Sequence, residues 1–178
     1  LLIKMKNIAI IGSGSWGVAL AIHLAKNGNK VKIWSFAQDE ADFIVLEGGV
    51  NDAWSSEIAL GDFNASAPLT SSYISNLVDT TYTGALETLF NNVQTKWPGK
   101  LIFFIIPHNM DLSNTKSYMD RAEEVCKKWG VILIDLRKLS GMNTYNEYIK
   151  TTYTNASDGV HPNRAGYEKF YIKPIDIS

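Results

Sequence analysis

The stretch "SDGVHPNRAGYEKF" near the end of the chain holds two side chains at a spacing that suits proton transfer. Asp158 and His161 are three residues apart, so a local turn can bring the carboxylate to the imidazole. The carboxylate would fix the histidine tautomer and stabilise the imidazolium, while His161 acts as general base for a serine nucleophile. The alternative interpretation is structural, with Asp158 as an acid at the start of the next helix and His161 as an exposed cap.

A second candidate site is the glycine-rich loop in "IAIIGSGSWG". Gly12, Gly14 and Gly17 have the spacing of a dinucleotide-binding loop between a strand and a helix. The first glycine permits the tight turn, the second lets a pyrophosphate approach the backbone, and the third lets the helix pack on the sheet. The loop could instead carry a catalytic hydroxyl on Ser13 or Ser15, or simply connect strand to helix.

The acidic residue that should hold a ribose after the second strand is not where it is expected. Phe36 occupies that place, and Asp39 and Glu40 come late. The glycine loop and the positive end of the following helix could still attract phosphates. NAD or NADP binding is therefore possible but expected to be weak.

Asn51, in "DFIVLEGGVND", supplies side-chain N–H groups of the kind that stabilise an oxyanion.

The other reactive side chains have simpler interpretations. His108 follows an apolar run and could line the same crevice, although a loop histidine is the simpler view, and His23 on a predicted helix is structural or exposed. Cys126 fits a packed core thiol on a helix. No cluster has the spacing of metal ligands, so no metal is expected.

Five apolar runs rich in β-branched and aromatic residues predict a parallel sheet that is buried on both faces. They cover residues 7–12, 30–36, 42–49, 100–107 and 130–136. Helical patterns alternate with them at residues 15–28, 82–97, 113–130 and 163–171. This alternation predicts a three-layer α/β/α sandwich with a doubly wound, flavodoxin-like sheet of strand order 2-1-3-4-5.

In this order the first and third strands flank the switch point, where ligands bind beyond the carboxyl ends of the strands. The glycine loop and the Gly48–Asp52 turn should therefore face one crevice. Ser113 or Asn114 is expected to cap the third helix. The Ser-, Thr- and Gly-rich stretch 53–81 is expected to be functional or partly mobile, because long loops in compact domains usually are.

Composition excludes several classes of partner. The chain has 178 residues and a formal net charge of −1, which suits one domain without a nucleic-acid footprint. No apolar run reaches the ~20 residues that span a bilayer. The opening "LLIKMKN" is too short for a signal peptide, and Met5 looks like an internal start with residues 1–4 as a leftover. We expect a cytoplasmic or recombinantly expressed protein.

Residues 5–36, "MKNIAIIGSGSWGVALAIHLAKNGNKVKIWSF", closely resemble the N-terminus of NAD(P)-dependent glycerol-3-phosphate dehydrogenases. The "IGSGSWG" loop and the "VKIWS" strand carry the likeness. In that family further nucleotide-domain strands follow, and then a helical domain with a catalytic lysine. None of these follows here.

From about residue 39 to residue 178 the chain resembles the SGNH, or GDSL-like, hydrolases, which are esterases, lipases and carbohydrate deacetylases. The turn "GGVND" looks like their Gly-x-Asn-Asp block, at Gly49, Asn51 and Asp52, and "SDGVH" looks like their Asp-x-x-His block, at Asp158 and His161. The family also needs Gly-Asp-Ser directly after the first strand. Here that block falls on Gly12, Ser13 and Gly14, so a glycine occupies the nucleophile position. The glycine that the family carries after its second strand, as an oxyanion donor, is also missing.

These resemblances favour a chimera, engineered or recombined, that forms one domain from a dehydrogenase-derived unit (residues 5–37) and a hydrolase-derived remainder (residues 38–178). We expect little or no hydrolase activity and no required cofactor. One alternative is an active esterase or deacetylase that uses Ser13 or Ser15 with Asp158 and His161, on a small-molecule ester or an acylated carbohydrate. Another is weak NAD(P) binding without turnover. No partner protein is indicated.

Overall fold

A five-stranded parallel sheet forms the centre of the computed structural model, which describes residues 7–10, 24–26, 30–33, 42–55 and 57–172. The strands are β1 (Asn7–Ile10), β2 (Lys30–Ile33), β3 (Phe43–Glu47), β4 (Leu101–Ile106) and β5 (Ile132–Asp135). Their order is β2-β1-β3-β4-β5, and every adjacent pair runs parallel. The predicted fold class and strand order are confirmed, and β1 and β3 flank the switch point.

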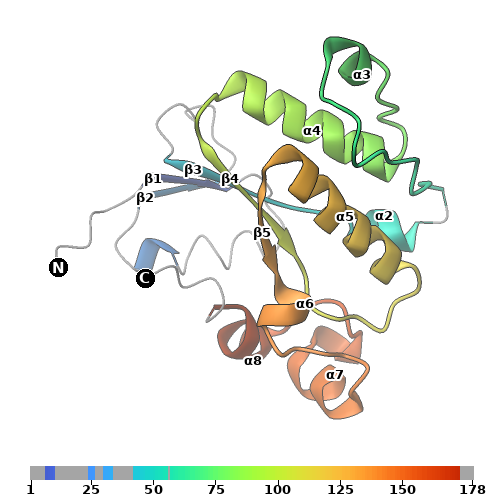
Figure 1. Cartoon of the computed structure of the whole chain (residues 1–178). Helices are drawn as coiled ribbons and strands as arrows, with labels where there is room; N and C mark the ends of the chain where they lie inside the picture. Colours follow the sequence, from blue (N-terminus) through green and yellow to red (C-terminus); the bar gives the residue numbers. More distant parts are fainter. Residues whose placement is uncertain (1–6, 11–23, 27–29, 34–41, 56, 173–178) are drawn as a thin grey trace.

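Two long helices, α4 (Tyr82–Lys96) and α5 (Thr115–Trp129), cover one face of the sheet (Figure 1). Both were predicted: α4 ends just before Pro98, and α5 ends at Gly130, whose φ of 66° suits glycine. Asn114, one of the two predicted cap residues, occupies the N-cap position of α5. Its φ is 65° and its side chain makes no capping hydrogen bond.

Shorter helical elements gather mostly beyond the carboxyl ends of the strands, and sequence periodicity identified only the last of them. They are α2 (Val50–Trp54), α3 (Ser71–Ser75), α6 (Leu136–Leu139), α7 (Glu147–Tyr153), a 3₁₀ turn (Asn155–Ser157), and α8 (Arg164–Gly166), which continues as a π turn (Tyr167–Tyr171). Figure 1 shows α7 and α8 together at this end, whereas α3 lies beside α4, away from α7 and α8. Of the predicted helix at 15–28, residues 24–26 are described and are helical.

Alternation along the central strands buries both faces of the sheet. Ile102, Phe104 and Ile106 of β4 pack with α4 and α5, whereas Ile105 packs in a second cluster with the C-terminal helical turns. All four side chains are at most 5% exposed. A strand that is buried on both faces reads as a continuous apolar run, which explains why "LIFFII" shows no polar alternation.

The long segment 57–81, which was expected to be functional or partly mobile, packs on α4 and α5. Its anchor is Lys128, whose Nζ donates to the Asn64 carbonyl at 2.9 Å, to the Tyr73 hydroxyl at 2.5 Å and to Glu87 at 3.0 Å. Glu87 is 2% exposed and also accepts from the Trp129 indole. A buried ion pair of this kind is costly to break because the remaining charge loses its partner.

Among the described residues, no helix is long and apolar enough to cross a lipid bilayer.

Candidate active site

Asp158 and His161 form a hydrogen-bonded pair, hereafter the Asp–His pair. His161 Nδ1 lies 2.7 Å from Asp158 Oδ2, and the other carboxylate oxygen accepts the backbone N–H groups of Val160 and His161 at 2.8 and 2.9 Å. Burial pushes the pKa of Asp158 up, but these hydrogen bonds outweigh it and the net pKa is lowered. Because an ionised carboxylate only accepts hydrogen bonds, the proton of neutral His161 belongs on Nδ1. This leaves Nε2 as the basic nitrogen.

The loop that carries the pair is held by unusual backbone conformations. Ala156 and Ser157 have φ values of 49° and 58°, and Gly159 has 77°. Residues other than glycine adopt left-handed conformations mainly where the surrounding structure imposes them. Here an isolated bridge between Thr154 and Pro162 closes the base of the loop, where the Asn155 N–H donates to the His161 carbonyl at 2.8 Å.

The residues after His161 fix the start of α8. Asn163 caps the helix by accepting the Gly166 N–H at 3.0 Å, and its amide donates to the Thr152 carbonyl at 2.9 Å. A Cβ at Gly166 would lie 2.3 Å from the Tyr153 carbonyl oxygen, so only glycine allows α8 to approach α7 this closely. The residues of "HPNRAG" thus fix the position of the turn that joins His161 to α8.

The turn between β3 and α2 brings Asn51 to the same edge of the sheet. Gly49 has a φ of 105°, and a Cβ there would lie 2.6 Å from the Tyr82 hydroxyl oxygen. Both the dihedral angle and the close contact require glycine. The turn leads directly into α2, where Asn51 is exposed.

Asn51 and His161 line the same cavity, which has a volume of about 360 Å³. Asn51 and Asp52 line one side, and His161, Tyr167 and Tyr171 line the other. The Gly48–Asp52 turn and His161 both line this cavity, whereas the glycine loop, which was expected to face the same crevice, lies outside the described residues.

Glu47, the last residue of β3, also lines this cavity. Part of the residue is open to solvent, but the protein packed around its carboxyl raises its pKa. Together with Asp52 it gives the described wall of the cavity an acidic character.

The burial and the contacts of His108, which follows β4, could not be predicted from the sequence. Its side chain lies in the loop as expected, but it is only 2% exposed, and both ring nitrogens have partners. Nδ1 lies 2.5 Å from the Tyr171 hydroxyl, and Nε2 lies 3.2 Å from the Gly159 carbonyl. Burial lowers the pKa of His108 to about 4, so the ring is neutral at pH 7. The sequence offered one signal, a histidine directly after a buried strand.

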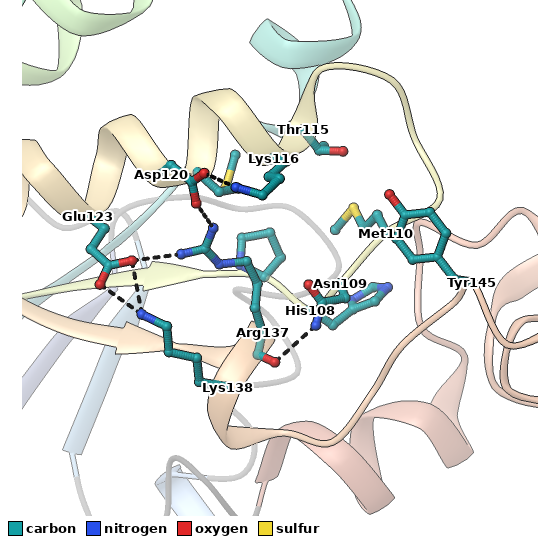
Figure 2. A pocket seen from close by; sticks show the side chains of 12 residues that line it. His108, Asn109, Met110, Thr115, Lys116, Asp120, Glu123, Arg137, Lys138 and Tyr145 are labelled. Atoms are coloured by element: carbon teal, nitrogen blue, oxygen red, sulfur yellow. Dashed lines mark hydrogen bonds and ion pairs between the residues drawn. The ribbon is translucent and has the colours of Figure 1, made fainter.

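A second cavity, of about 490 Å³, lies on the other side of His108, between α5 and α6 (Figure 2). Arg137 donates to Asp120 at 2.7 Å and to Glu123 at 3.0 Å, and it forms a two-pronged contact with Asp135. Lys116 and Lys138 pair with the same carboxylates. The cations of this cavity are therefore neutralised internally, which makes it a poor site for an anionic ligand.

Five predicted site residues lie outside the described part of the chain, namely Gly12, Ser13, Gly14, Ser15 and Gly17, and so does His23. Cys126 is 1% exposed, as expected for a core thiol, and burial raises its pKa to about 12. Within the described residues, no group of three or more His, Cys, Asp or Glu side chains could hold a metal ion.

Comparisons of sequence find similarity in the N-terminal part of the chain. Residues 7–60 match the family model of the NAD-dependent glycerol-3-phosphate dehydrogenase N-terminus. Glycerol-3-phosphate dehydrogenase [NAD(P)+] of Coxiella burnetii (strain Dugway 5J108-111) is 54% identical over 41 residues, which is 23% of this chain and 12% of that protein. The enzyme of Fusobacterium nucleatum is 58% identical over 38 residues, or 21% of this chain and 11% of that protein. The matched segment thus spans about one eighth or less of the length of these relatives.

Comparisons of structure cover nearly the whole chain. A protein from Lactobacillus plantarum superimposes with a TM-score of 0.69 at 20% identity, over 96% of this chain and 92% of that one. A GDSL-like lipase of Bacteroides ovatus gives 0.58 at 14%, over 93% and 94%. Phospholipase A1 of Streptomyces albidoflavus gives 0.55 at 13%, over 96% and 98%. The fold is that of the GDSL-like lipases.

The two sets of comparisons agree with both resemblances read from the sequence. They also overlap, because the dehydrogenase match extends through β3 and α2 to residue 60 and so includes the Gly49–Asp52 turn.

Proposed function

We propose that the chain is a recombined or engineered hybrid. It keeps the general base of a serine ester hydrolase, His161 with Asp158, and lacks the nucleophilic serine. Residues 5–37 would be the dehydrogenase-derived unit and residues 38–178 the hydrolase-derived remainder of one domain. The observation that carries the proposal is the cavity that Asn51 and His161 both line, together with the 2.7 Å hydrogen bond between His161 Nδ1 and Asp158 Oδ2. We expect little or no ester hydrolysis, since Gly14 stands where the nucleophilic serine belongs.

The proposed chemistry divides the work among three side chains. His161 Nε2 would take the proton of an attacking hydroxyl, and Asp158 would hold the ring and stabilise the imidazolium that forms. The Asn51 amide would donate to the oxyanion of the tetrahedral intermediate. None of these steps needs a metal or a cofactor. A substrate would be a small-molecule ester or an acylated carbohydrate, which are the substrates of the resembling family.

Hydrolysis of a small activated acetyl ester tests this directly. We expect the unmodified chain to hydrolyse the ester at a rate close to that of His161→Ala and close to the background. Ser13→Ala and Ser15→Ala serve as matched controls, because each removes one hydroxyl from the loop that follows β1.

A rate well above background that collapses in His161→Ala would contradict this prediction. It would favour the alternative in which the chain is an active esterase, and the serine variant that loses activity would identify the nucleophile.

Weak dinucleotide binding is the second candidate function, favoured by the dehydrogenase match over residues 7–60. Gly12, Gly14 and Gly17 would hold the pyrophosphate at the start of the helix. One feature weakens the site, because the ribose carboxylate is missing from its usual place.

Calorimetric titration with NAD and with NADP should therefore give dissociation constants no better than roughly 0.1–1 mM, or about 4–5.5 kcal/mol. Gly14→Val is a suitable control, because a side chain there should block the approach of the pyrophosphate. A micromolar constant that the control variant abolishes would show that the loop has kept a working dinucleotide site.

A further inference from the structure

The loop of the Asp–His pair is anchored at its middle by buried side chains. Gly159 lies between the two members of the pair, and its carbonyl accepts the Thr144 hydroxyl at 2.8 Å. The same carbonyl lies 3.2 Å from His108 Nε2, and the Gly159 N–H donates to the Thr154 hydroxyl at 3.1 Å. Both peptide groups of this residue are thus bonded to buried side chains, while His161 lines the cavity.

The hydrogen-bond partners of His108 fix which ring nitrogen carries the proton. Burial raises the pKa of Tyr171, so its hydroxyl stays protonated and can donate to His108 Nδ1 at 2.5 Å. His108 Nε2 then carries the proton and donates to the Gly159 carbonyl. The Tyr171 oxygen in turn accepts the His108 backbone N–H at 3.3 Å. Every polar group in this chain of contacts is satisfied by one arrangement of protons.

We propose that His108, oriented by Tyr171, is a positioning residue that holds the Gly159 carbonyl and thereby keeps Asp158 bonded to His161. The proposal rests on the proposed role of the Asp–His pair as the base of the site. His108 touches neither the pair nor the 360 Å³ cavity, and it acts through the backbone between Asp158 and His161.

The geometry explains why this contact matters for the pair. The loop contains two left-handed residues other than glycine, so it needs external contacts to keep its conformation. Loss of the His108 contact would leave the Gly159 carbonyl with the Thr144 hydroxyl as its one remaining side-chain donor among the described residues, so the peptide group would be less constrained. The same peptide group carries the Val160 N–H, which donates to Asp158 Oδ1 at 2.8 Å, so a rotation of this group would shift the carboxylate relative to His161 Nδ1. His161 would then behave as a solvated imidazole, which prefers its proton on Nε2.

The tautomer of His161 is therefore the measurement that reports positioning. We would label the full chain with ¹⁵N-histidine and record long-range proton–nitrogen spectra at a pH where His161 is neutral, assigning its signals with His161→Ala. In the unmodified chain we expect the proton on Nδ1. In His108→Ala and in Tyr171→Phe we expect the Nδ1–H population to fall by roughly half or more. In His108→Gln, whose amide nitrogen can still reach Gly159, we expect most of it to return.

Tyr118→Phe is the matched control, because it removes a buried tyrosine hydroxyl that donates to the Ile58 carbonyl on the other face of the sheet. It should lower the thermal midpoint much as Tyr171→Phe does, while His161 keeps its proton on Nδ1. If His108→Ala does not fold, Tyr171→Phe and His108→Gln decide the question by themselves.

Three results would overturn the positioning role. A folded His108→Ala or Tyr171→Phe with an unchanged His161 tautomer would show that the loop holds the pair without His108, and the proposed function would stand. An equal change in Tyr118→Phe would show a general effect of lost stability. An unmodified chain in which His161 carries its proton on Nε2 would instead remove the Asp–His pair itself, and the proposed function with it.

Discussion

The double change Ser13→Asp with Gly14→Ser should convert the chain into a slow ester hydrolase that depends on His161. It restores Gly-Asp-Ser at residues 12–14, directly after β1, which lies beside β3 in the sheet. The sequence predicts a strand-to-helix turn at the new hydroxyl, and the N-terminus of the predicted helix would favour developing negative charge there. The hydroxyl proton would pass to His161 Nε2, held by the Asp158 contact of 2.7 Å.

The rate should remain far below that of an intact enzyme. The oxyanion donor that the hydrolase family places after its second strand is missing, and loss of one such donor costs on the order of 10²–10³ in rate. Turnover of the activated acetyl ester checks the prediction, with the same double variant carrying His161→Ala as the matched control. A folded double variant without His161-dependent hydrolysis would show that the loop after β1 does not align with the Asp–His pair.

The stability of the chain should fall as the pH drops from about 6.5 to about 4, because of His108. Its pKa is about 4 in the folded chain, against an ordinary value of 6.5. The unfolded chain therefore binds a proton first, and the linkage relation makes the free energy of unfolding decrease with pH in this window. The full shift corresponds to about 3 kcal/mol at pH 4.

His108→Gln isolates this effect because it removes the titrating ring but keeps a donor toward Gly159. Urea unfolding at pH 7 and at pH 4 should show a smaller loss of stability in the variant, by about 3 kcal/mol. Asp158 acts weakly on His108 in the opposite sense and is present in both proteins. Equal losses in the two proteins would mean that His108 titrates normally in the folded chain.

Those parts of the fold that depend on long periodic patterns could be predicted from the sequence. The apolar runs at 42–49 and 100–107 became β3 and β4, and α4 and α5 ended where Pro98 and Gly130 indicated. The short helices α2, α3, α6 and α7 were not predicted as helices. They have between four and seven residues, at most two turns, which is too short for a helical pattern to stand out.

The candidate site could be predicted only where its parts are local or fixed by strand order. Asp158 and His161 are three residues apart, so their contact follows from one turn, and Asn51 reaches the same cavity because β3 ends at the switch point. The contact of His108 with Tyr171 joins residues 63 positions apart, and its contact with Gly159 joins residues 51 apart. Neither contact leaves a pattern in the sequence, so His108 could not be distinguished from an ordinary loop histidine.

The packing of segment 53–81 could not be predicted for a related reason. Its polar composition is typical of a mobile loop, but residues 57–81 are held by side chains that belong to α4 and α5. Lys128 alone joins Asn64, Tyr73 and Glu87 in one buried cluster. Composition describes the segment itself and carries no information on such distant partners.

The proposed hybrid has the base of a serine hydrolase and no serine that this base can activate. Reaction with an activated fluorophosphonate, followed by intact mass and peptide mapping, tests this most directly, since the reagent modifies a serine that a nearby base activates. We predict that the unmodified chain keeps its mass, while the Ser13→Asp, Gly14→Ser variant gains one adduct at position 14 that His161→Ala abolishes. An adduct on Ser13 or Ser15 of the unmodified chain, lost in His161→Ala, would contradict the claim.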